Sequence, residues 1–144
     1  MHIELAETEE AIKSCYQVIK ELRPHLSENA FVAQVIRQIE RYDYSLVYIR
    51  NSHDVVAAAG FRVAEYLAWG KTFYVDDLIT LSSERNQGYA SHLMNWLRDR
   101  AIELGCNEFH LDSGPQRHDA HRLYKNKQLD ITSFHFSMQL KNIK

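Results

Sequence analysis

The stretch Arg85-Asn86-Gln87-Gly88-Tyr89-Ala90 decides the fold, because it marks a turn from a strand into a helix. An apolar run precedes it at residues 74–81, and an amphipathic stretch follows at residues 91–104. The first backbone N–H groups of a helix have no intrahelical partner and the helix dipole makes that end positive, so phosphates bind there readily. Gly88 keeps the loop thin, and Arg85 can add a planar cationic group. This segment therefore predicts a phosphate-bearing cofactor on the turn from strand to helix.

Outward from this turn, hydrophobic periodicity predicts alternating strands and helices. We expect a helix at residues 9–22, a second capped by Ser27, and two more at residues 91–104 and 120–127. The expected strands are residues 3–6, 45–50, 55–68, 72–81, 108–112 and 131–140. The order β-α-α-β-β-β-α-β-α-β follows from these patterns alone.

Length and composition limit the classes of function. A chain of 144 residues predicts one domain, and a net charge of −2 without a long basic run argues against nucleic-acid binding. Cys15 and Cys106 lie far apart, which predicts core thiols in a reducing cytoplasm rather than a disulfide framework or a nucleophile. We expect no membrane association, because no apolar stretch approaches the ~20 residues that a span needs.

Three motifs in the expected order resemble the GNAT N-acetyltransferase superfamily. Residues 85–90 match its R/Q-x-x-G-x-G/A acetyl-CoA pyrophosphate signature, and Asp76-Asp77-Leu78-Ile79-Thr80 lies where the family places its pantetheine-binding strand. Ala120 precedes Tyr124 by four residues, as in the later GNAT helix. The resemblance covers nearly the whole chain. It implies one α/β GNAT domain over residues 1–144 with a central mixed, mostly antiparallel sheet of about six to seven strands flanked by helices.

The resemblance also implies a donor and the residues that bind it. The donor is acetyl-CoA, and no metal is expected. The pantetheine arm should insert where the fourth and fifth strands splay apart. The expected cofactor contacts are Leu78, Ile79, Thr80, Arg85, Asn86, Gln87, Gly88, Tyr89, Ala90 and Ser91.

Asp76 and Asp77 are two carboxylates in an otherwise apolar strand, where burial is costly without partners. Because side chains alternate along a strand, we expect one on each face of the sheet. They resemble the Glu-Asp pair of GNAT enzymes that acetylate polyamines. That resemblance implies that Asp76 draws the proton of the amine, through water, and that Asp77 holds the cationic substrate. The alternative is that both acids form ion pairs with arginines or cap local backbone, and which acid has which role stays open.

Tyr124 lies where GNAT enzymes often keep a tyrosine that protonates the departing thiolate. The resemblance therefore implies a catalytic acid at Tyr124, and the alternative is a core aromatic residue that needs only its ring buried.

The segment at residues 112–121 departs from the family pattern. Arg117 replaces an asparagine that often contacts the cofactor, and it can reach a phosphate of CoA instead. His118 and His121 with nearby acids are compatible with a metal site or with a substrate contact. Asp119 is expected to cap the helix, which argues against a metal site.

The function that these observations favour is acetyl transfer from acetyl-CoA to a primary amine in a ternary complex. A small amine is favoured over a protein amine as the acceptor. The alternative is a non-catalytic acyl-CoA-binding or sensor module. A homodimer is kept as a candidate assembly.

Overall fold

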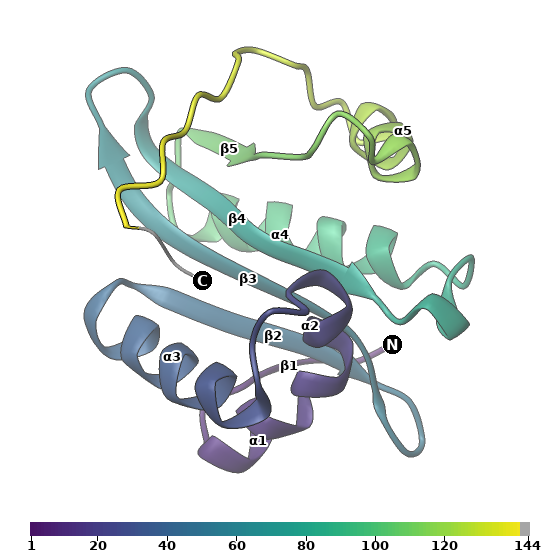
Figure 1. Cartoon of the computed structure of the whole chain (residues 1–144). Coiled ribbons are helices and arrows are strands. Elements are labelled where there is room, and N and C mark those ends of the chain that lie inside the picture. Colours follow the sequence, from purple (N-terminus) through teal and green to yellow (C-terminus); the bar gives the residue numbers. More distant parts are fainter. Residues whose placement is uncertain (142–144) are drawn as a thin grey trace. The chain divides into compact units, whose positions relative to one another are not determined.

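The computed structural model describes residues 1–141 and separates into two compact units, Met1–Leu111 and the chain from Asp112 onward. The first unit contains the sheet and four of the helices (Figure 1). The second unit contains the last helix and the C-terminal segment. Each unit is described by itself below.

The sheet of the first unit has five strands in the order β1-β2-β3-β4-β5. The strands are β1 Ile3–Leu5, β2 Tyr44–Arg50, β3 Val55–Tyr66, β4 Gly70–Thr80 and β5 Glu108–Leu111. The first four pair antiparallel, and β5 joins β4 in parallel after the crossover through a helix. The predicted mixed, mostly antiparallel sheet is confirmed, although it has five strands rather than six to seven.

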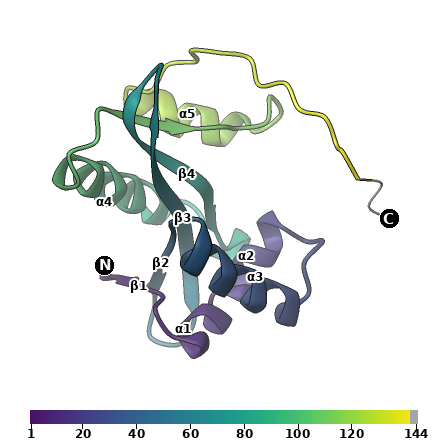
Figure 2. The same cartoon turned by 90° about the vertical axis from the view of Figure 1, so that its left-hand side faces the viewer.

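The helices of this unit cover both faces of the sheet (Figure 2). They are α1 Glu9–Ser14, α2 Tyr16–Leu22, α3 Glu28–Arg41 and α4 Tyr89–Glu103. Helices α1 to α3 lie on one face, where Ile12, Val18 and Phe31 pack into a core with β2 and β3. Helix α4 buries Leu93 and Leu97 on the opposite face. No helix within residues 1–141 combines the length and the apolar character that crossing a bilayer requires.

The single helix predicted at residues 9–22 is wrong, because the structure divides it at Cys15 into α1 and α2. Ser14 Oγ donates to the Ala11 carbonyl, and the amide of Cys15 bonds to Ile12, which tightens the last turn of α1. Such local bonds compete with the regular helical ladder. The predicted cap at Ser27 is confirmed, because its Oγ accepts from the amide of Ala30 at 3.2 Å.

In the second unit, α5 spans His118–Asn126. The predicted cap at Asp119 is wrong: Asp119 lies inside the first helical turn, and Arg117 occupies the N-cap without a side-chain cap bond.

The strand predicted at residues 131–140 is also wrong in this structure, which assigns these residues no secondary structure. Alternation of apolar side chains describes only one face of a strand, whereas a strand forms only where a neighbour completes its backbone hydrogen bonds.

Candidate active site

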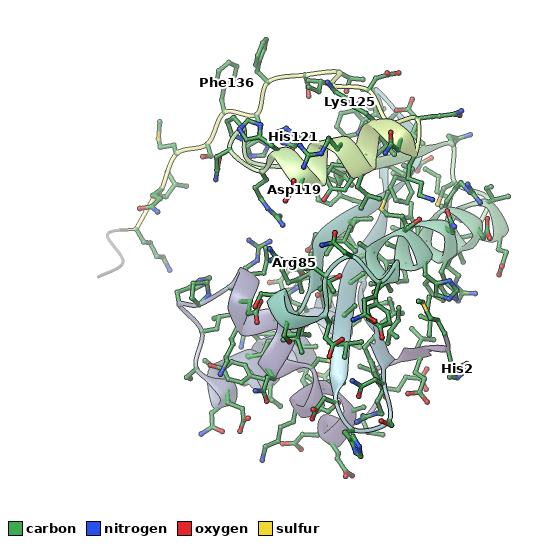
Figure 3. The ribbon with its side chains drawn as sticks, turned by 90° about the vertical axis from the view of Figure 1, so that its right-hand side faces the viewer. His2, Arg85, Asp119, His121, Lys125 and Phe136 are labelled. Atoms are coloured by element: carbon green, nitrogen blue, oxygen red, sulfur yellow. The ribbon has the colours of Figure 1, made fainter. Side chains whose placement is uncertain are left out.

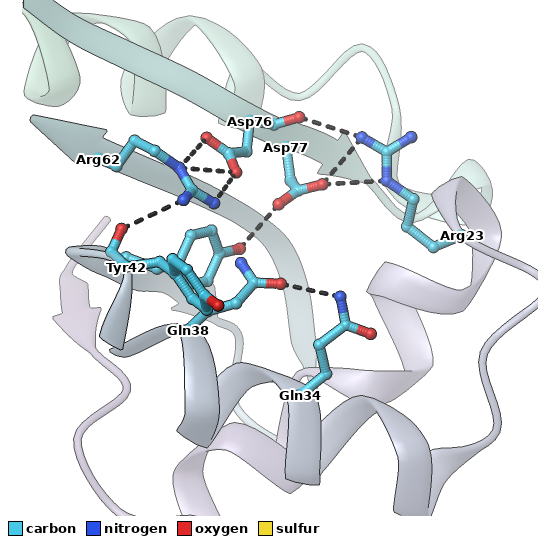
Figure 4. A network of polar contacts seen from close by, with 8 residues as sticks. Arg23, Gln34, Gln38, Tyr42, Arg62, Asp76 and Asp77 are labelled. Carbon is cyan, nitrogen blue, oxygen red and sulfur yellow. Dashed lines mark hydrogen bonds and ion pairs between the residues drawn. The ribbon is translucent and has the colours of Figure 1, made fainter. Parts of the chain in front are cut away.

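A bulge in β4 shapes the candidate site. Gly60 of β3 pairs with Asp77 and Phe61 pairs with Val75, so Asp76 is an extra residue on β4. An extra residue interrupts the alternation of side chains. The prediction that the two acids lie on opposite faces is therefore wrong, since Asp76 and Asp77 both line one pocket on the face of α2 and α3 (Figure 4).

Asp76 forms a two-pronged ion pair with Arg62 of β3. Nε of Arg62 donates to both carboxylate oxygens, at 3.0 and 3.1 Å, and its Nη2 donates to Oδ2. Its remaining Nη1 donates to the Tyr42 carbonyl, so the guanidinium is held on three sides (Figure 4). Hydrogen bonding to Asp76 raises the pKa of Arg62, against the opposing effect of burial. Arg62 therefore balances the charge of Asp76 and fixes its position.

Asp77 is held by one arginine and one tyrosine. Nε of Arg23 donates to Oδ1 of Asp77 at 3.0 Å, and the Tyr44 hydroxyl donates to Oδ2 at 2.8 Å. Nη2 of Arg23 also donates to the Asp76 carbonyl, so Arg23 ties the end of α2 to the bulge. Burial raises the pKa of Tyr44 well above its ordinary value, with a further contribution from the charge of Asp77. The hydroxyl therefore stays protonated and serves as a hydrogen-bond donor.

Gly60 makes room for this arrangement. A Cβ atom at Gly60 would lie 1.8 Å from the Tyr44 hydroxyl oxygen, closer than packed atoms approach. The absent side chain leaves space at Gly60 for the Tyr44 ring, whose hydroxyl donates to Asp77.

The pocket in front of these acids has a volume of about 440 Å³. Its polar lining includes the Gln34 and Gln38 side chains of α3, which bond to each other at 2.9 Å. The lining carries two arginines, two aspartates and His25. The charges of the arginines and the aspartates cancel, so the pocket is not acidic.

The opposite edge of β4 is only partly covered by β5. Pairing with β5 runs from Thr72 to Val75, whereas pairing with β3 continues to Thr80. The stretch Asp76–Thr80 therefore extends past the β5 ladder, as the predicted splay between these strands requires. The Thr80 hydroxyl is buried and has no hydrogen-bond partner within residues 1–141.

The loop between β4 and α4 has the conformation of a helix start. A short 3₁₀ turn at Ser82–Glu84 leads into it, and Asn86 and Gly88 adopt positive φ values of 65° and 84°. Gly88 is the N-cap of α4 and no side chain caps the helix. The first bond of the helix runs from His92 to the Gly88 carbonyl, which leaves the amides of Tyr89–Ser91 outside the intrahelical ladder.

Side chains do not crowd this loop. Arg85, Asn86 and Gln87 are exposed, and Gln87 bonds to Glu84 at 3.2 Å (Arg85 is labelled in Figure 3). A Cβ atom at Gly88 would meet nothing closer than the Met1 side chain at 4.0 Å. The loop therefore presents open backbone amides at the positive end of a helix, the arrangement that phosphates favour.

Tyr124 of α5 is buried within the structure. Burial raises the pKa of its hydroxyl, and the charge of Arg117 opposes that effect.

In the same unit, His121 Nε2 lies 2.8 Å from the Gly114 carbonyl oxygen, and the rings of His118 and His121 meet edge to face (Figure 3 labels His121). Across the described residues, no three His, Cys, Asp or Glu side chains gather as metal ligands.

The cysteines are free thiols. Cys15 lies fully buried in the core, and burial raises the pKa of its thiol to about 12. A thiol with that pKa is protonated at neutral pH and is a poor nucleophile.

Sequence reasoning missed the groups that hold the acids, which are Arg23, Tyr44 and Arg62. Arg62 had a usable signal, because it lies in an apolar strand facing the acid-bearing strand across a hairpin. Arg23 and Tyr44 had none, since they lie 54 and 33 residues from Asp77.

Comparison with known proteins identifies the family of this chain. The family model for the acetyltransferase (GNAT) family matches residues 5–128, and the chain belongs to that family. A curated relative, the uncharacterized N-acetyltransferase YhdJ of Bacillus subtilis, is 26% identical over 127 residues, which cover 88% of this chain and 89% of the relative.

Solved structures share the fold at lower identity. A protein of Bacillus halodurans described as a transcriptional regulator superposes with a TM-score of 0.84 at 21% identity, covering 96% of this chain and 100% of its own. The acetyltransferase AAC(6')-Iy, bound to a bisubstrate analogue of CoA and acetylneamine, superposes with a TM-score of 0.81 at 14% identity. That comparison covers 99% of this chain and 100% of AAC(6')-Iy.

Proposed function

We propose that this chain transfers the acetyl group of acetyl-CoA directly to a primary amine on a small molecule. The observation that carries the proposal is that β4 borders both candidate sites. Its Asp76–Thr80 stretch extends past β5 and leads to the open helix start, and its bulge turns two carboxylates into a pocket of about 440 Å³. Donor and acceptor would therefore meet at the same stretch of strand.

The donor would lie along β4 with its diphosphate on the loop. Backbone groups of Leu78, Ile79 and Thr80 are candidates for the pantetheine arm, whose polar groups would also satisfy the buried Thr80 hydroxyl. The amides of Gln87 to Ser91 would hold the diphosphate, with Arg85 and Asn86 beside it. The described residues fit this donor because Gly88 leaves open space where the phosphates would lie.

A small acceptor is supported by the size of the pocket and by one solved structure with the same fold. A volume of about 440 Å³ lies within the ~300–1,000 Å³ range typical of small-molecule pockets. AAC(6')-Iy, which has the same fold, is described as an aminoglycoside N-acetyltransferase. That description concerns a different protein, and it supports the class of small amines here without naming the acceptor.

The chemistry assigned to this chain's residues is proton transfer and positioning. The neutral amine attacks the thioester carbonyl carbon and forms the C–N bond, the C–S bond breaks, and the nitrogen loses one proton for the proton that the departing sulfur gains. We assign to Asp76 the removal of the amine proton through water, and to Asp77 the holding of the amine. Tyr124 is assigned to give a proton to the departing thiolate.

Release of CoA tests the proposed activity. We expect free thiol to appear only when acetyl-CoA and an accepted amine are both present, because direct transfer needs both substrates in one complex. A panel of small primary amines, amino acids and a lysine peptide should be screened by thiol detection, with mass spectrometry of the acetylated product. Tight CoA binding with no amine-dependent thiol release across that panel would instead favour a non-catalytic acyl-CoA-binding module.

Gly88→Asp is expected to weaken CoA binding at least about 10-fold, which corresponds to ~1.4 kcal/mol. The substitution places a negative charge where the diphosphate would lie, at a residue with φ of 84°. Isothermal calorimetry measures the affinity directly.

Gly105→Asp is the matched control, because Gly105 has a φ of 75° at the other end of α4 and nothing within 4 Å of an added Cβ. Both variants carry the same type of backbone strain, so a loss of CoA affinity in Gly88→Asp alone reports on the phosphate site. Equal CoA affinities in the two variants would contradict the predicted diphosphate site.

A further inference from the structure

The charges that line the acceptor pocket are already paired inside the protein. Arg62 forms an ion pair with Asp76, and Arg23 forms one with Asp77 at 2.9 Å between nitrogen and oxygen. Within residues 1–141, no third aspartate or glutamate lines this pocket, which belongs entirely to the first unit. A second ammonium group on the acceptor would therefore find no carboxylate there, which argues against a polycationic acceptor.

The two acids still have room for one amine. An ionised carboxylate offers about four lone-pair sites. Asp77 accepts hydrogen bonds from Arg23 and Tyr44, and Asp76 accepts them from Nε and Nη2 of Arg62. An ammonium group could use the remaining sites, but it would lie close to both guanidinium groups. A simple cationic amine would thus bring a third positive charge to two negative ones, and like charges at short range repel.

Arg23 is the group that can compensate for this third charge. Its Nε and Nη2 donate to Asp77 and to the Asp76 carbonyl, whereas its Nη1 has no hydrogen-bond partner within residues 1–141 (Figure 4). The Arg23 side chain is 41% exposed and that of Arg62 is 27% exposed. All three nitrogens of Arg62 already donate within the protein. Because a guanidinium binds planar carboxylates well, Arg23 can bind a second carboxylate without releasing Asp77.

We propose that the acceptor is a small amino acid, whose carboxylate binds Arg23 while Asp76 and Asp77 hold its amine. This inference rests on the proposed acetyl transfer, because it takes the pocket as the acceptor site. Charges would then alternate from guanidinium to aspartate to ammonium to carboxylate. The acceptor would add no net charge to a pocket whose arginines and aspartates cancel. Ile19, Phe31 and Val35 also line the pocket and offer apolar contacts to the carbon chain of the acceptor.

Acceptors that differ in the charge of one group test the proposal. L-leucine and β-alanine should be compared with L-leucinamide and β-alaninamide, in which a neutral amide replaces the carboxylate, and with spermidine as a polycation. We expect kcat/KM for each amino acid to exceed that for its amide, and that for spermidine, at least about 10-fold. A neighbouring carboxylate raises the pKa of an amine, so the amides hold more of the neutral, reactive form. A preference for the amino acids would therefore come from binding of the carboxylate.

Arg23→Gln removes the guanidinium and keeps a polar side chain. We expect kcat/KM to fall at least about 10-fold more for the amino acids than for their amides, so the preference should approach one. General damage to the fold would affect both acceptors of a pair equally and would leave this ratio unchanged. Lys20→Gln is the matched control, because it removes a positive charge from an exposed position of α2 that does not line the pocket. Its preference should equal that of the wild type.

Calorimetry of L-leucine and β-alanine binding to the complex with CoA separates this inference from the proposed activity. An affinity that falls at least about 10-fold in Arg23→Gln would support the carboxylate site even if no amine released thiol, an outcome that would contradict only the acetyl transfer. Thiol release that favours the amides or spermidine, or a preference that survives Arg23→Gln, would overturn the inference and leave acetyl transfer unaffected. Absence of both binding and turnover for the two amino acids would also overturn it.

Discussion

Replacing Asp76 with asparagine is expected to lower turnover by roughly 10²- to 10⁴-fold, the range that general base catalysis contributes. An alkylamine with a pKa near that of lysine, about 10.4, is almost wholly protonated at neutral pH, so a group in the site must accept its proton. Asp76 faces the pocket from the bulge of β4 and is our candidate for that group. Steady-state turnover of the wild type and the variant, measured at saturating acetyl-CoA and amine, checks this expectation.

The ion pair with Arg62 requires a control, because asparagine also leaves that arginine without its charged partner. The control is the double variant Arg62→Gln/Asp76→Asn, which removes both charges together. If Asp76 accepts the proton, the double variant should be as slow as Asp76→Asn alone. Recovery of wild-type turnover in the double variant would show that the pair serves only the balance of charge.

Asp77→Asn separates binding from chemistry. Because Asp77 is assigned to hold the amine, its replacement should mainly raise KM for the amine and leave kcat closer to the wild-type value. Tyr44→Phe is the matched variant, since it removes the hydroxyl that donates a hydrogen bond to Asp77 and keeps the carboxylate of Asp77. Wild-type turnover and amine affinity in both aspartate variants would return the acid pair to a structural role.

Local signals in the sequence were sufficient for the parts of the fold that depend on neighbouring residues. The cap at Ser27, the turn into α4 at Gly88 and the order of strands in the hairpin are each specified within a few residues. Helix starts and positive-φ glycines have this property because their hydrogen bonds and steric limits are local.

The environment of the acids could not be predicted in the same way. The alternation of side chains along a strand predicted Asp76 and Asp77 on opposite faces of the sheet. Only the pairing of Gly60 with Asp77 reveals the bulge that brings the two acids to one face. The partner Arg23 lies at the C-cap of α2, 54 residues from Asp77 in the sequence. Residues 131–140 show the same limit, because a strand pattern does not say which edge supplies its neighbour.

Tyr124→Phe is expected to lower turnover by about 10²-fold with little change in CoA affinity, because it removes one hydroxyl and keeps the ring. Burial raises the pKa of Tyr124, so its proton stays available through the neutral range and is lost only above the ordinary tyrosine value of about 10. The wild-type rate should therefore fall at strongly alkaline pH, as the hydroxyl deprotonates, and this limb should be absent in the variant.

The acidity of the leaving thiol distinguishes a catalytic acid at Tyr124 from a core aromatic residue. A thiol that is more acidic than that of CoA departs readily as a thiolate and gains little from protonation, so an acetyl thioester of such a thiol should restore much of the rate of Tyr124→Phe. A residue that only packs the core would slow every donor by the same factor. Tyr66→Phe, at a partly exposed tyrosine on β3, is the control for loss of a hydroxyl elsewhere. Equal losses with both donors, or unchanged turnover where chemistry limits the rate, would assign Tyr124 to packing alone.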